Sequence, residues 1–250
     1  MPPYEQPREQ VPAHNPWIIP LAIVLSGALI GAGIYMSKRF TPTDSGAGLS
    51  KNVIGDVNLN PVGPSDHILG NPNAPVKIIE YTDTECPFCK TFHQTMQRIM
   101  ATYGKEGQVA WVIRHFPIDQ LHKRAHKEAV ATECANELGG EPKFWEYIDE
   151  VFARTDSNDT LDPSELPKIA KEIGLNEKDF EKCLTTTKYD SLILTQSQDA
   201  VRAGATGTPH SVLIAANGSK VAIKGSQPYD VMKAVIDAAL EQASAPALQN

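Results

Sequence analysis

The sequence predicts an α/β fold in which a β-sheet core is split by an inserted helical domain and preceded by an N-terminal transmembrane helix. Strand-like segments occur on both sides of residues 118–203, whereas apolar residues within that range follow helical spacing throughout. An uncharged apolar run at residues 17–36 has the length that spans a bilayer, and it predicts the membrane helix.

The composition is typical of a globular protein. The 250 residues are 41% hydrophobic and 21% charged, and their formal net charge is -7. This length is sufficient for one sizeable core. Because an acidic chain repels phosphate backbones, we expect no nucleic acid among its partners.

The predicted membrane anchor follows a polar, proline-containing tail at residues 1–16. Trp17 and Tyr35 lie near the two ends of the apolar run, where amphipathic aromatic side chains prefer the membrane interface. The alternative is a cleaved secretory signal, but the run is long for a signal and no Ala-x-Ala site closes it. We therefore expect a retained, single-pass helix.

The cysteines predict on which side of the membrane the folded region lies. Four cysteines, an even number, agree with an oxidising compartment outside the cytoplasm. Lys38 and Arg39 follow the anchor, and the positive-inside rule alone would keep this flank in the cytoplasm. Two charges are a small bias, so the expected location is the cell membrane, with the folded domain extracytoplasmic.

The first half of the sheet core is predicted at residues 61–117. It follows residues 37–60, which are rich in turn formers and small polar residues and are expected to form a linker and lead-in. Ile78 and Ile79 indicate a buried strand, and alternating side chains at 108–116 indicate a second strand.

The helical insertion, residues 118–203, is predicted to contain five helices. Apolar residues recur at helical spacing over 125–138, 144–153, 163–173, 177–184 and 189–203. Asp159, Asp162 and Asn176 are candidate N-caps of these helices.

The second half of the core is predicted at residues 204–243. Strands at 211–215 and 220–223 flank Asn217-Gly218, a strong signal for a two-residue hairpin turn. An amphipathic helix at 229–243 follows, and a short tail, residues 244–250, ends the chain.

Cys86-Pro87-Phe88-Cys89 lies where the first strand is followed by an amphipathic helix. Free N–H groups and the positive dipole at a helix N-terminus favour thiolate, which is the nucleophilic form of cysteine. Two cysteines separated by two residues can close and reopen a disulfide, which is the chemistry of thiol–disulfide exchange. The alternative, half of a zinc site, needs a second ligand pair that the sequence does not offer.

Together these features resemble the DsbA-like branch of the thioredoxin-fold thiol:disulfide oxidoreductases. The resemblance covers about residues 66–240, and the inserted helices distinguish this branch from plain thioredoxin. Its motifs are Cys86-Pro87-Phe88-Cys89, Gly207-Thr208-Pro209 before the late strand, Arg114-His115-Phe116-Pro117 at the end of the second strand, and Phe144-Trp145 in the insertion. It implies a thioredoxin-like fold with a helical insertion.

The resemblance also implies roles for further residues. It implies a cis Thr208–Pro209 bond beside the cysteines, where the backbone of Thr208 would pair with an extended substrate segment. It places a buried acid at Glu80, which could carry a proton to or from Cys89. The alternatives are an ordinary turn proline and a solvated strand-end carboxylate.

Two disulfides are implied by the resemblance. The redox-active one joins Cys86 and Cys89. Some relatives carry a second, non-catalytic disulfide in the insertion, which implies a structural bond between Cys134 and Cys183. The alternatives for this second pair are two buried free thiols or a regulatory pair.

Two acidic residues lie close to the cysteine motif. The negative charges of Asp83 and Glu85 are expected to oppose a thiolate at Cys86 and to make the protein a milder oxidant. The Pro-Phe dipeptide between the cysteines also departs from the Pro-His of the strongest oxidases. The direction of electron flow is therefore left open by the sequence.

Other charged residues have expected positions near the site. Arg114 and His115 end the second strand and could oppose Glu80. His122 and His126 are expected to lie in a solvated basic patch rather than to bind a metal.

The resemblance predicts a membrane-tethered, extracytoplasmic thiol:disulfide oxidoreductase that oxidises cysteine pairs in exported proteins. It needs no organic cofactor, because the dithiol is the redox centre. The family implies that a quinone-linked membrane oxidase returns the site to its disulfide. The alternatives are a disulfide isomerase or reductase kept reduced, and a non-redox peptide-binding or chaperone module on the same fold.

Overall fold

The computed structural model describes residues 57–244. Residues 1–56 and 245–250 lie outside this range, and with them the predicted membrane-spanning segment at 17–36. Within the described range, no helix combines the length and the apolar character needed to cross a bilayer.

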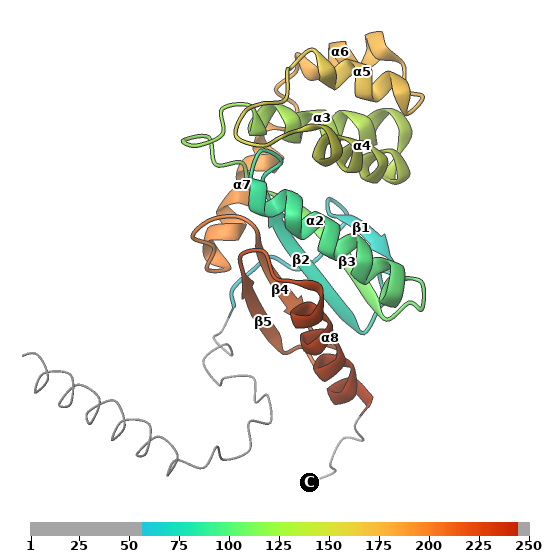
Figure 1. The fold of residues 1–250 in the computed structure, drawn as a ribbon, viewed down its shortest axis with the longest axis vertical. Helices are drawn as coiled ribbons and strands as arrows, with labels where there is room; N and C mark the ends of the chain where they lie inside the picture. The colour runs from blue at the N-terminus through green and yellow to red at the C-terminus, as the bar shows by residue number, and fades with distance from the viewer. Residues whose placement is uncertain (1–56, 245–250) are drawn as a thin grey trace, which may run out of the picture. The chain divides into compact units, whose positions relative to one another are not determined.

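A five-stranded sheet with the order β1-β3-β2-β4-β5 forms the centre of the described region (Figure 1). The strands are β1 (His67–Gly70), β2 (Val76–Thr82), β3 (Val109–His115), β4 (His210–Ile214) and β5 (Lys220–Lys224). β2 pairs in parallel with β3 and antiparallel with β4, so the two halves of the chain meet along β2. The predicted α/β fold with a helical insertion is confirmed.

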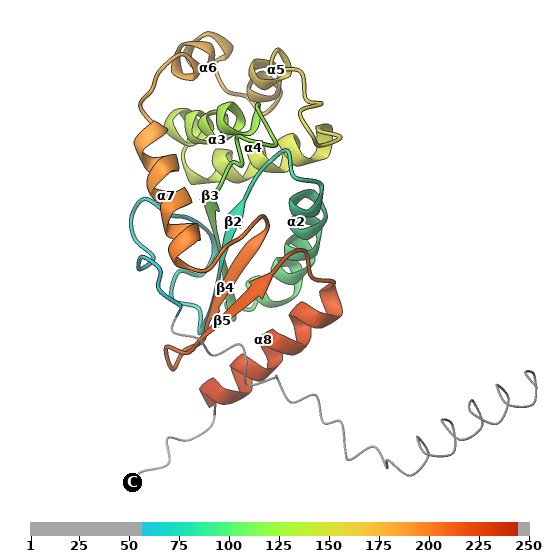
Figure 2. The same ribbon diagram turned by 90° about the vertical axis from the view of Figure 1, so that its left-hand side faces the viewer.

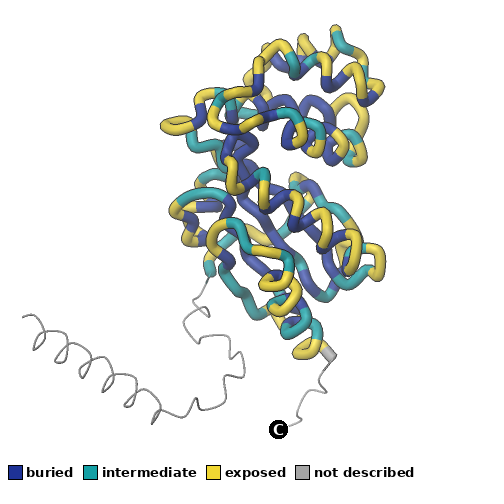
Figure 3. Tube along the Cα trace, in the orientation of Figure 1, coloured by how far each residue is buried: buried dark blue, intermediate teal, exposed yellow. Residues whose placement is uncertain are grey.

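The strands β2 and β3 are buried on both faces, since each has apolar side chains on both sides (Figure 3). Ile78 and Trp111 belong to the core on one face of the sheet, and Ile79 and Val112 to the core on the other. Since neighbouring residues of a strand point to opposite faces, this alternation fixes the register of β2 against β3.

Helices cover both faces of the sheet (Figure 2). On one face lie α2 (Pro87–Ile99), which a π-helical turn at Met100–Gly104 extends, and α8 (Tyr229–Ser244). On the other face, α7 (Asp190–Arg202) packs through Ala200. The residues at the start of α2 thus lie at the end of the central strand β2.

The insertion between β3 and β4 carries the remaining helices. They are α3 (Ala125–Gly139), α4 (Glu141–Arg154), α5 (Glu165–Glu172) and α6 (Glu177–Leu184). Tyr147 and Phe180 pack ring against ring in a separate core between them. A disulfide between Cys134 and Cys183 joins α3 to α6.

The predicted N-caps are only partly found. Asn176 caps α6 by accepting a hydrogen bond from a first-turn N–H. Asp159 caps no helix that follows it. Its carboxylate instead accepts hydrogen bonds from two N–H groups just before α3, which a local sequence pattern cannot reveal. Asp162 lies before Ser164, the residue at the N-cap of α5, and accepts its N–H.

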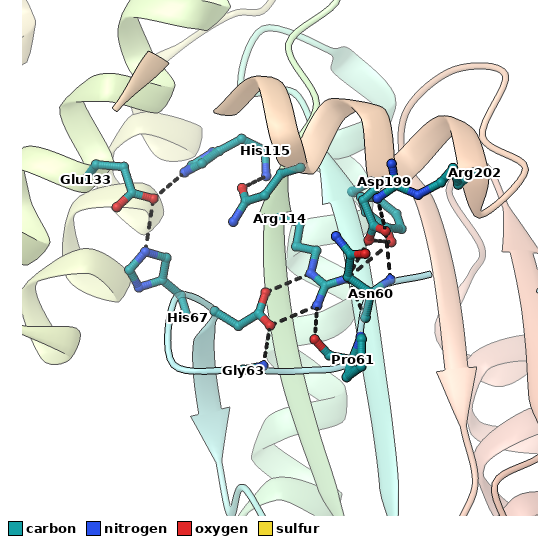
Figure 4. Close-up of polar contacts among 12 residues, drawn as sticks. Asn60, Pro61, Gly63, His67, Arg114, His115, Glu133, Asp199 and Arg202 are labelled. Atoms are coloured by element: carbon teal, nitrogen blue, oxygen red, sulfur yellow. Dashed lines mark hydrogen bonds and ion pairs between the residues drawn. The ribbon is translucent and has the colours of Figure 1, made fainter. Parts of the chain in front are cut away.

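A buried cluster of ionisable side chains joins the sheet to the insertion (Figure 4). Glu133 of α3 contacts Nε2 of His67 in β1 at 3.1 Å and Nε2 of His115 in β3 at 2.9 Å. Glu141 of α4 contacts Nδ1 of His67 at 2.8 Å. Burial lowers the pKa of His67, but the two carboxylates outweigh burial and raise it to about 9.

A second buried cluster surrounds Arg114 at the end of β3 (Figure 4). Its guanidinium contacts Asp66 at 2.7 Å and Asp199 of α7 at 2.5 Å. It also donates to the backbone carbonyls of Asn60 and Pro61. Arg114 therefore ties the lead-in segment and α7 to the central sheet.

Candidate active site

The cysteine motif lies where β2 is followed by α2. β2 ends at Thr82, a short turn follows, and α2 begins at Pro87 with Cys86 as its N-cap residue. Proline suits the first helical position because it has no N–H to leave unpaired and its φ is already helical. The sulfur of Cys86 therefore lies at the positive end of the helix dipole.

The fold brings Cys86 next to a segment from the far end of the chain. Its sulfur lies 3.4 Å from the backbone oxygen of Thr208, a residue 122 positions away. The Thr208–Pro209 peptide bond is cis, and β4 begins directly after it. The structure thus brings together Cys86, Cys89, Thr208 and Pro209, as the resemblance implied.

The surroundings of Cys86 favour its thiolate. The pKa of Cys86 is lowered to about 6, chiefly by its hydrogen bond with the Cys89 thiol and against the opposing effect of burial. Thr208 and the N–H groups of Phe88 and Cys89 lower it further. At neutral pH this sulfur is therefore mostly ionised, which is the state that attacks a disulfide.

Cys89 has the opposite properties. It is fully buried, and burial raises the pKa of its thiol well above the usual value, with a further contribution from Cys86. Both cysteines are free thiols, so the structure is that of the reduced site. One sulfur is ready to attack, and the other keeps its proton.

Glu80 lies on β2, buried in the core behind the cysteines. Its Oε2 accepts a hydrogen bond of 3.0 Å from the indole of Trp111, and its Oε1 has no partner among the described residues. Burial is the main cause that raises the pKa of Glu80 to about 8; the bond from Trp111 lowers this pKa, and the charge of Cys86 adds to the rise. This burial excludes the alternative of a solvated carboxylate and leaves a carboxyl group that holds a proton at neutral pH.

Asp83 and Glu85 are buried, and the side chain of each accepts hydrogen bonds from neighbouring groups. Asp83 accepts hydrogen bonds from His122 and from the N–H of Ile118. Glu85 accepts them from residues of the insertion. The pKa of Cys86 is lowered overall although these two acidic residues lie close to it. The consequence for the reduction potential stays a prediction.

Of the two histidines expected in a solvated basic patch, His122 and His126, one was wrongly placed. His122 is buried against Asp83, whose bond raises the pKa of His122 although burial opposes it. The cause is that α3 starts only at Ala125, so His122 belongs to a turn packed on the active site. His126 is half-exposed and pairs with Asp190.

Arg114 and His115 were expected to oppose Glu80, and this expectation was wrong. The described partners of Arg114 include Asp66 and Asp199, and those of His115 include Glu133. Glu80 instead accepts a hydrogen bond from Trp111, a core residue of β3.

Sequence reasoning missed Glu128 of α3. Its Oε2 accepts a hydrogen bond of 2.6 Å from the hydroxyl of Thr84, two residues before Cys86. A glutamate on a predicted helix gives no signal of such a contact, because the contact depends on how the insertion packs on the core.

A small cavity of about 160 Å³ adjoins the cis-proline segment. It is lined by residues 206–210 and by Lys224 and Gly225. Phe88, between the two cysteines, is one of the exposed large apolar residues. Among the described residues, no three His, Cys, Asp or Glu side chains are arranged to hold a metal ion.

Comparison with known families and structures agrees with this geometry. A family model described as thioredoxin matches residues 63–238. The crystal structure of alpha-DsbA1 from Wolbachia pipientis superposes with a TM-score of 0.65, at 26% identity over 73% of this chain and 94% of that one. DsbA2 from Pseudomonas aeruginosa gives a TM-score of 0.59, at 28% identity over 76% of this chain and 100% of that one.

Among curated proteins, the chain is similar to parts of longer ones. It is 34% identical to the Na(+)/H(+) antiporter NhaA 1 of Mycolicibacterium gilvum (strain PYR-GCK) over 125 residues, which are 50% of this chain and 19% of that protein. A match to NhaA 3 of Salinispora tropica covers 78% of this chain and 30% of that protein, at 28% identity. The chain therefore spans less than a third of the length of these relatives.

Proposed function

The chain belongs to the thioredoxin family as a DsbA-like thiol:disulfide oxidoreductase, and on this premise we propose that it oxidises pairs of cysteines in exported proteins. The supporting observation is the lowered pKa of Cys86, about 6, beside a buried Cys89 that keeps its proton. A stabilised thiolate stabilises the reduced site, and a site that is stable when reduced is a strong oxidant in its disulfide form.

The reaction begins with the Cys86–Cys89 disulfide. A client thiolate attacks Sγ of Cys86, a bond forms between these two sulfurs, and the bond to Cys89 breaks. The electron pair leaves on Cys89, whose buried thiolate takes up a proton. Glu80 holds a proton at neutral pH and interacts electrostatically with Cys89, so it is the proposed donor.

A second client thiolate completes the transfer. It attacks the client sulfur of the mixed disulfide, which closes the client disulfide and releases Cys86 as a thiolate. Two electrons have then passed from the client to the enzyme dithiol. The low pKa of Cys86 makes it a good leaving group for this step.

The cis-proline segment is the proposed binding site for the client backbone. Thr208 lies against the sulfur of Cys86, and Pro209 has no N–H to donate. An extended client segment can therefore pair with the backbone of Thr208 while its cysteine reaches Cys86. The cavity beside residues 206–210 offers space for a neighbouring client side chain.

The oxidase assignment is tested by equilibrating the purified protein with glutathione buffers. We expect a potential clearly more oxidising than that of thioredoxin, about -270 mV. Cys86→Ala and Cys89→Ala should each abolish oxidation of a dithiol peptide, because neither variant can form the Cys86–Cys89 disulfide. With glutathione disulfide, Cys89→Ala should accumulate a mixed disulfide between Cys86 and glutathione, with release of one glutathione. A potential near the thioredoxin value would favour a reductase, and client binding that survives both substitutions without any redox turnover would favour a chaperone module.

We further propose that residues 17–36 tether the domain outside the cytoplasm and that a quinone-linked membrane oxidase restores the disulfide. The apolar run and the redox chemistry of Cys86 support this proposal. In intact cells, a membrane-impermeant thiol reagent should label Cys86 of the Cys89→Ala variant, and alkylation trapping should find the wild-type pair oxidised. Labelling only after lysis would contradict the location, and a reduced pair would favour an isomerase or reductase.

A further inference from the structure

Two buried carboxyl groups meet beside the nucleophile. Glu85 directly precedes Cys86, and Glu128 projects from α3 of the insertion. Both side chains are almost completely buried. Among the described residues, neither has a salt bridge to a lysine, arginine or histidine, so no cation neutralises them.

Both carboxyl oxygens of Glu85 accept hydrogen bonds from the insertion. Its Oε2 accepts hydrogen bonds from the N–H of Asp159 at 2.8 Å and from the hydroxyl of Thr155 at 3.1 Å. Its Oε1 accepts one from the N–H of Leu161 at 3.4 Å. Because both oxygens of Glu85 already accept hydrogen bonds, Glu85 is the acceptor of this pair and Glu128 is the donor.

The segment that holds Glu85 has an unusual backbone. Ser157, Asn158 and Asp159 all have positive φ angles, at 69°, 57° and 64°. Non-glycine residues rarely adopt this region, so surrounding contacts must hold the segment in place. Besides the bond from Asp159, the N–H of Asn158 donates to the backbone oxygen of Glu85 at 2.8 Å.

Glu128 faces the same turn from the other side. Its Oε2 accepts the hydroxyl of Thr84, and its side chain is hydrogen-bonded to Glu85. Burial raises the pKa of Glu128 to about 9, the bond to Glu85 raises it further, and the hydroxyl of Thr84 lowers it. A carboxyl–carboxylate pair needs one shared proton, and these contacts place that proton on Glu128.

We propose that Glu128 is a positioning residue for the nucleophile: as a protonated acid it donates to Glu85 and thereby holds the Thr84–Cys86 turn against the insertion. This inference rests on the proposed thiol exchange at Cys86. It assigns to the insertion a direct part in the active site, through one hydrogen bond.

The other charged groups around this pair are accounted for. Asp83 raises the pKa of Glu128 by its charge and is itself paired with His122. Tyr147 of α4 lies close enough for Glu128 to raise the pKa of its hydroxyl, which stays protonated. No positive charge among these described groups would stabilise an ionised Glu128, so loss of its proton leaves two repelling carboxylates.

The test measures how fast the reduced protein attacks glutathione disulfide, a probe without a titrating thiol, across a range of pH. In the wild type, the rate should rise as Cys86 ionises near pH 6, and above about pH 9 it should fall relative to Glu128→Gln as Glu128 ionises. Glu80, whose pKa is about 8, titrates in both proteins, so the difference between them is the quantity to compare. Glu128→Gln keeps a neutral donor for Glu85, so it should keep the neutral rate and lose the alkaline fall.

Removing the donor should slow the exchange. Glu128→Ala should reduce the rate at neutral pH about tenfold, because a displaced nucleophile attacks in poor geometry. Glu146→Ala is the matched control: it removes an exposed glutamate of α4 that pairs with Lys143, and it should leave both rate and profile unchanged. Circular dichroism should show that every variant is folded.

Three results would overturn the inference. One is a Glu128→Ala rate equal to that of the wild type, another is a Glu128→Gln rate as low as that of Glu128→Ala, and the third is the same alkaline fall in wild type and Glu128→Gln. If the wild type itself does not attack the probe, the proposed exchange at Cys86 fails instead, which is a different outcome.

Discussion

Cys86 and Cys89 have the same side chain, and their different pKa values come from position alone. Cys86 precedes the first turn of α2 and receives hydrogen bonds there, whereas Cys89 lies one turn further on, inside the core. The first is therefore the attacking sulfur, and the second is the one that must gain or lose a proton in a site without solvent.

Glu80→Gln should change how stability depends on pH. Burial raises the pKa of Glu80 from about 4.5 to about 8, so between these values the folded protein binds one proton more than the unfolded chain. The free energy of unfolding of the reduced protein should then fall as pH rises through this window, by about 1.4 kcal/mol per pH unit. Denaturant unfolding at several pH values measures this slope.

The variant should lose that part of the slope, because glutamine does not titrate. His67 and Glu128 titrate in overlapping windows in both proteins, so the difference between variant and wild type is the quantity to compare. Equal slopes in the two proteins would mean that Glu80 has an ordinary pKa.

Some site residues could be predicted from the sequence, and others could not. The spacing of Cys86 and Cys89 and the position of Pro209 are local patterns, so the motif reveals them. Glu128 carries no such pattern, because its contact with Thr84 forms only when the insertion packs on the core.

At the scale of elements, periodicity predicted the helices and strands to within a few residues of their ends. The apolar residues of β2 and β3 and the asparagine cap of α6 are patterns of neighbouring residues, so the sequence alone could predict these elements. The role of Asp159 was not predictable, since its carboxylate caps a turn that is distant in sequence and adjacent only in the fold.

The Cys134–Cys183 disulfide, which joins α3 to α6, should contribute strongly to the free energy of unfolding. Replacing both Cys134 and Cys183 by alanine removes a cross-link over 49 residues, which the loop-entropy estimate values at about 4 kcal/mol. Denaturant unfolding of the oxidised wild type and the double variant measures the loss.

Thiol exchange gives the control for this prediction. Cys86 belongs to a separate core cluster, so the folded double variant should exchange at the wild-type rate. An unchanged free energy of unfolding would show that the bond does not restrict the unfolded chain.

At the scale of the whole molecule, Arg114 connects segments that the insertion separates in sequence. Arg114→Leu would leave Asp66 buried without its cation and would leave Asp199 with Arg202 as its remaining described cation. Stranding buried charges costs about 3–5 kcal/mol, so the free energy of unfolding should fall by that amount in chemical denaturation.

A surface ion pair provides the comparison. Lys233→Ala breaks the exposed contact with Asp237 and should leave stability nearly unchanged. An Arg114→Leu variant as stable as Lys233→Ala would show that the buried cluster is not needed to hold the lead-in and α7.

The order of strands and helices predicted the fold class because the long helical stretch can only lie between the two parts of one sheet. The buried cluster around Arg114 was not predictable, because its members come from the lead-in and from α7, which are distant from Arg114 in sequence. The membrane anchor at 17–36 stays a prediction.

The sheet order also determines when, during synthesis, the active site around Cys86 can be complete. β2 has β3 and β4 as neighbours, and Thr208 emerges from the ribosome 122 residues after Cys86. A growing chain therefore carries a thiol that has neither its cis-proline neighbour nor its closing strand. The site around Cys86 is therefore complete only after β4 has been synthesised and has paired with β2.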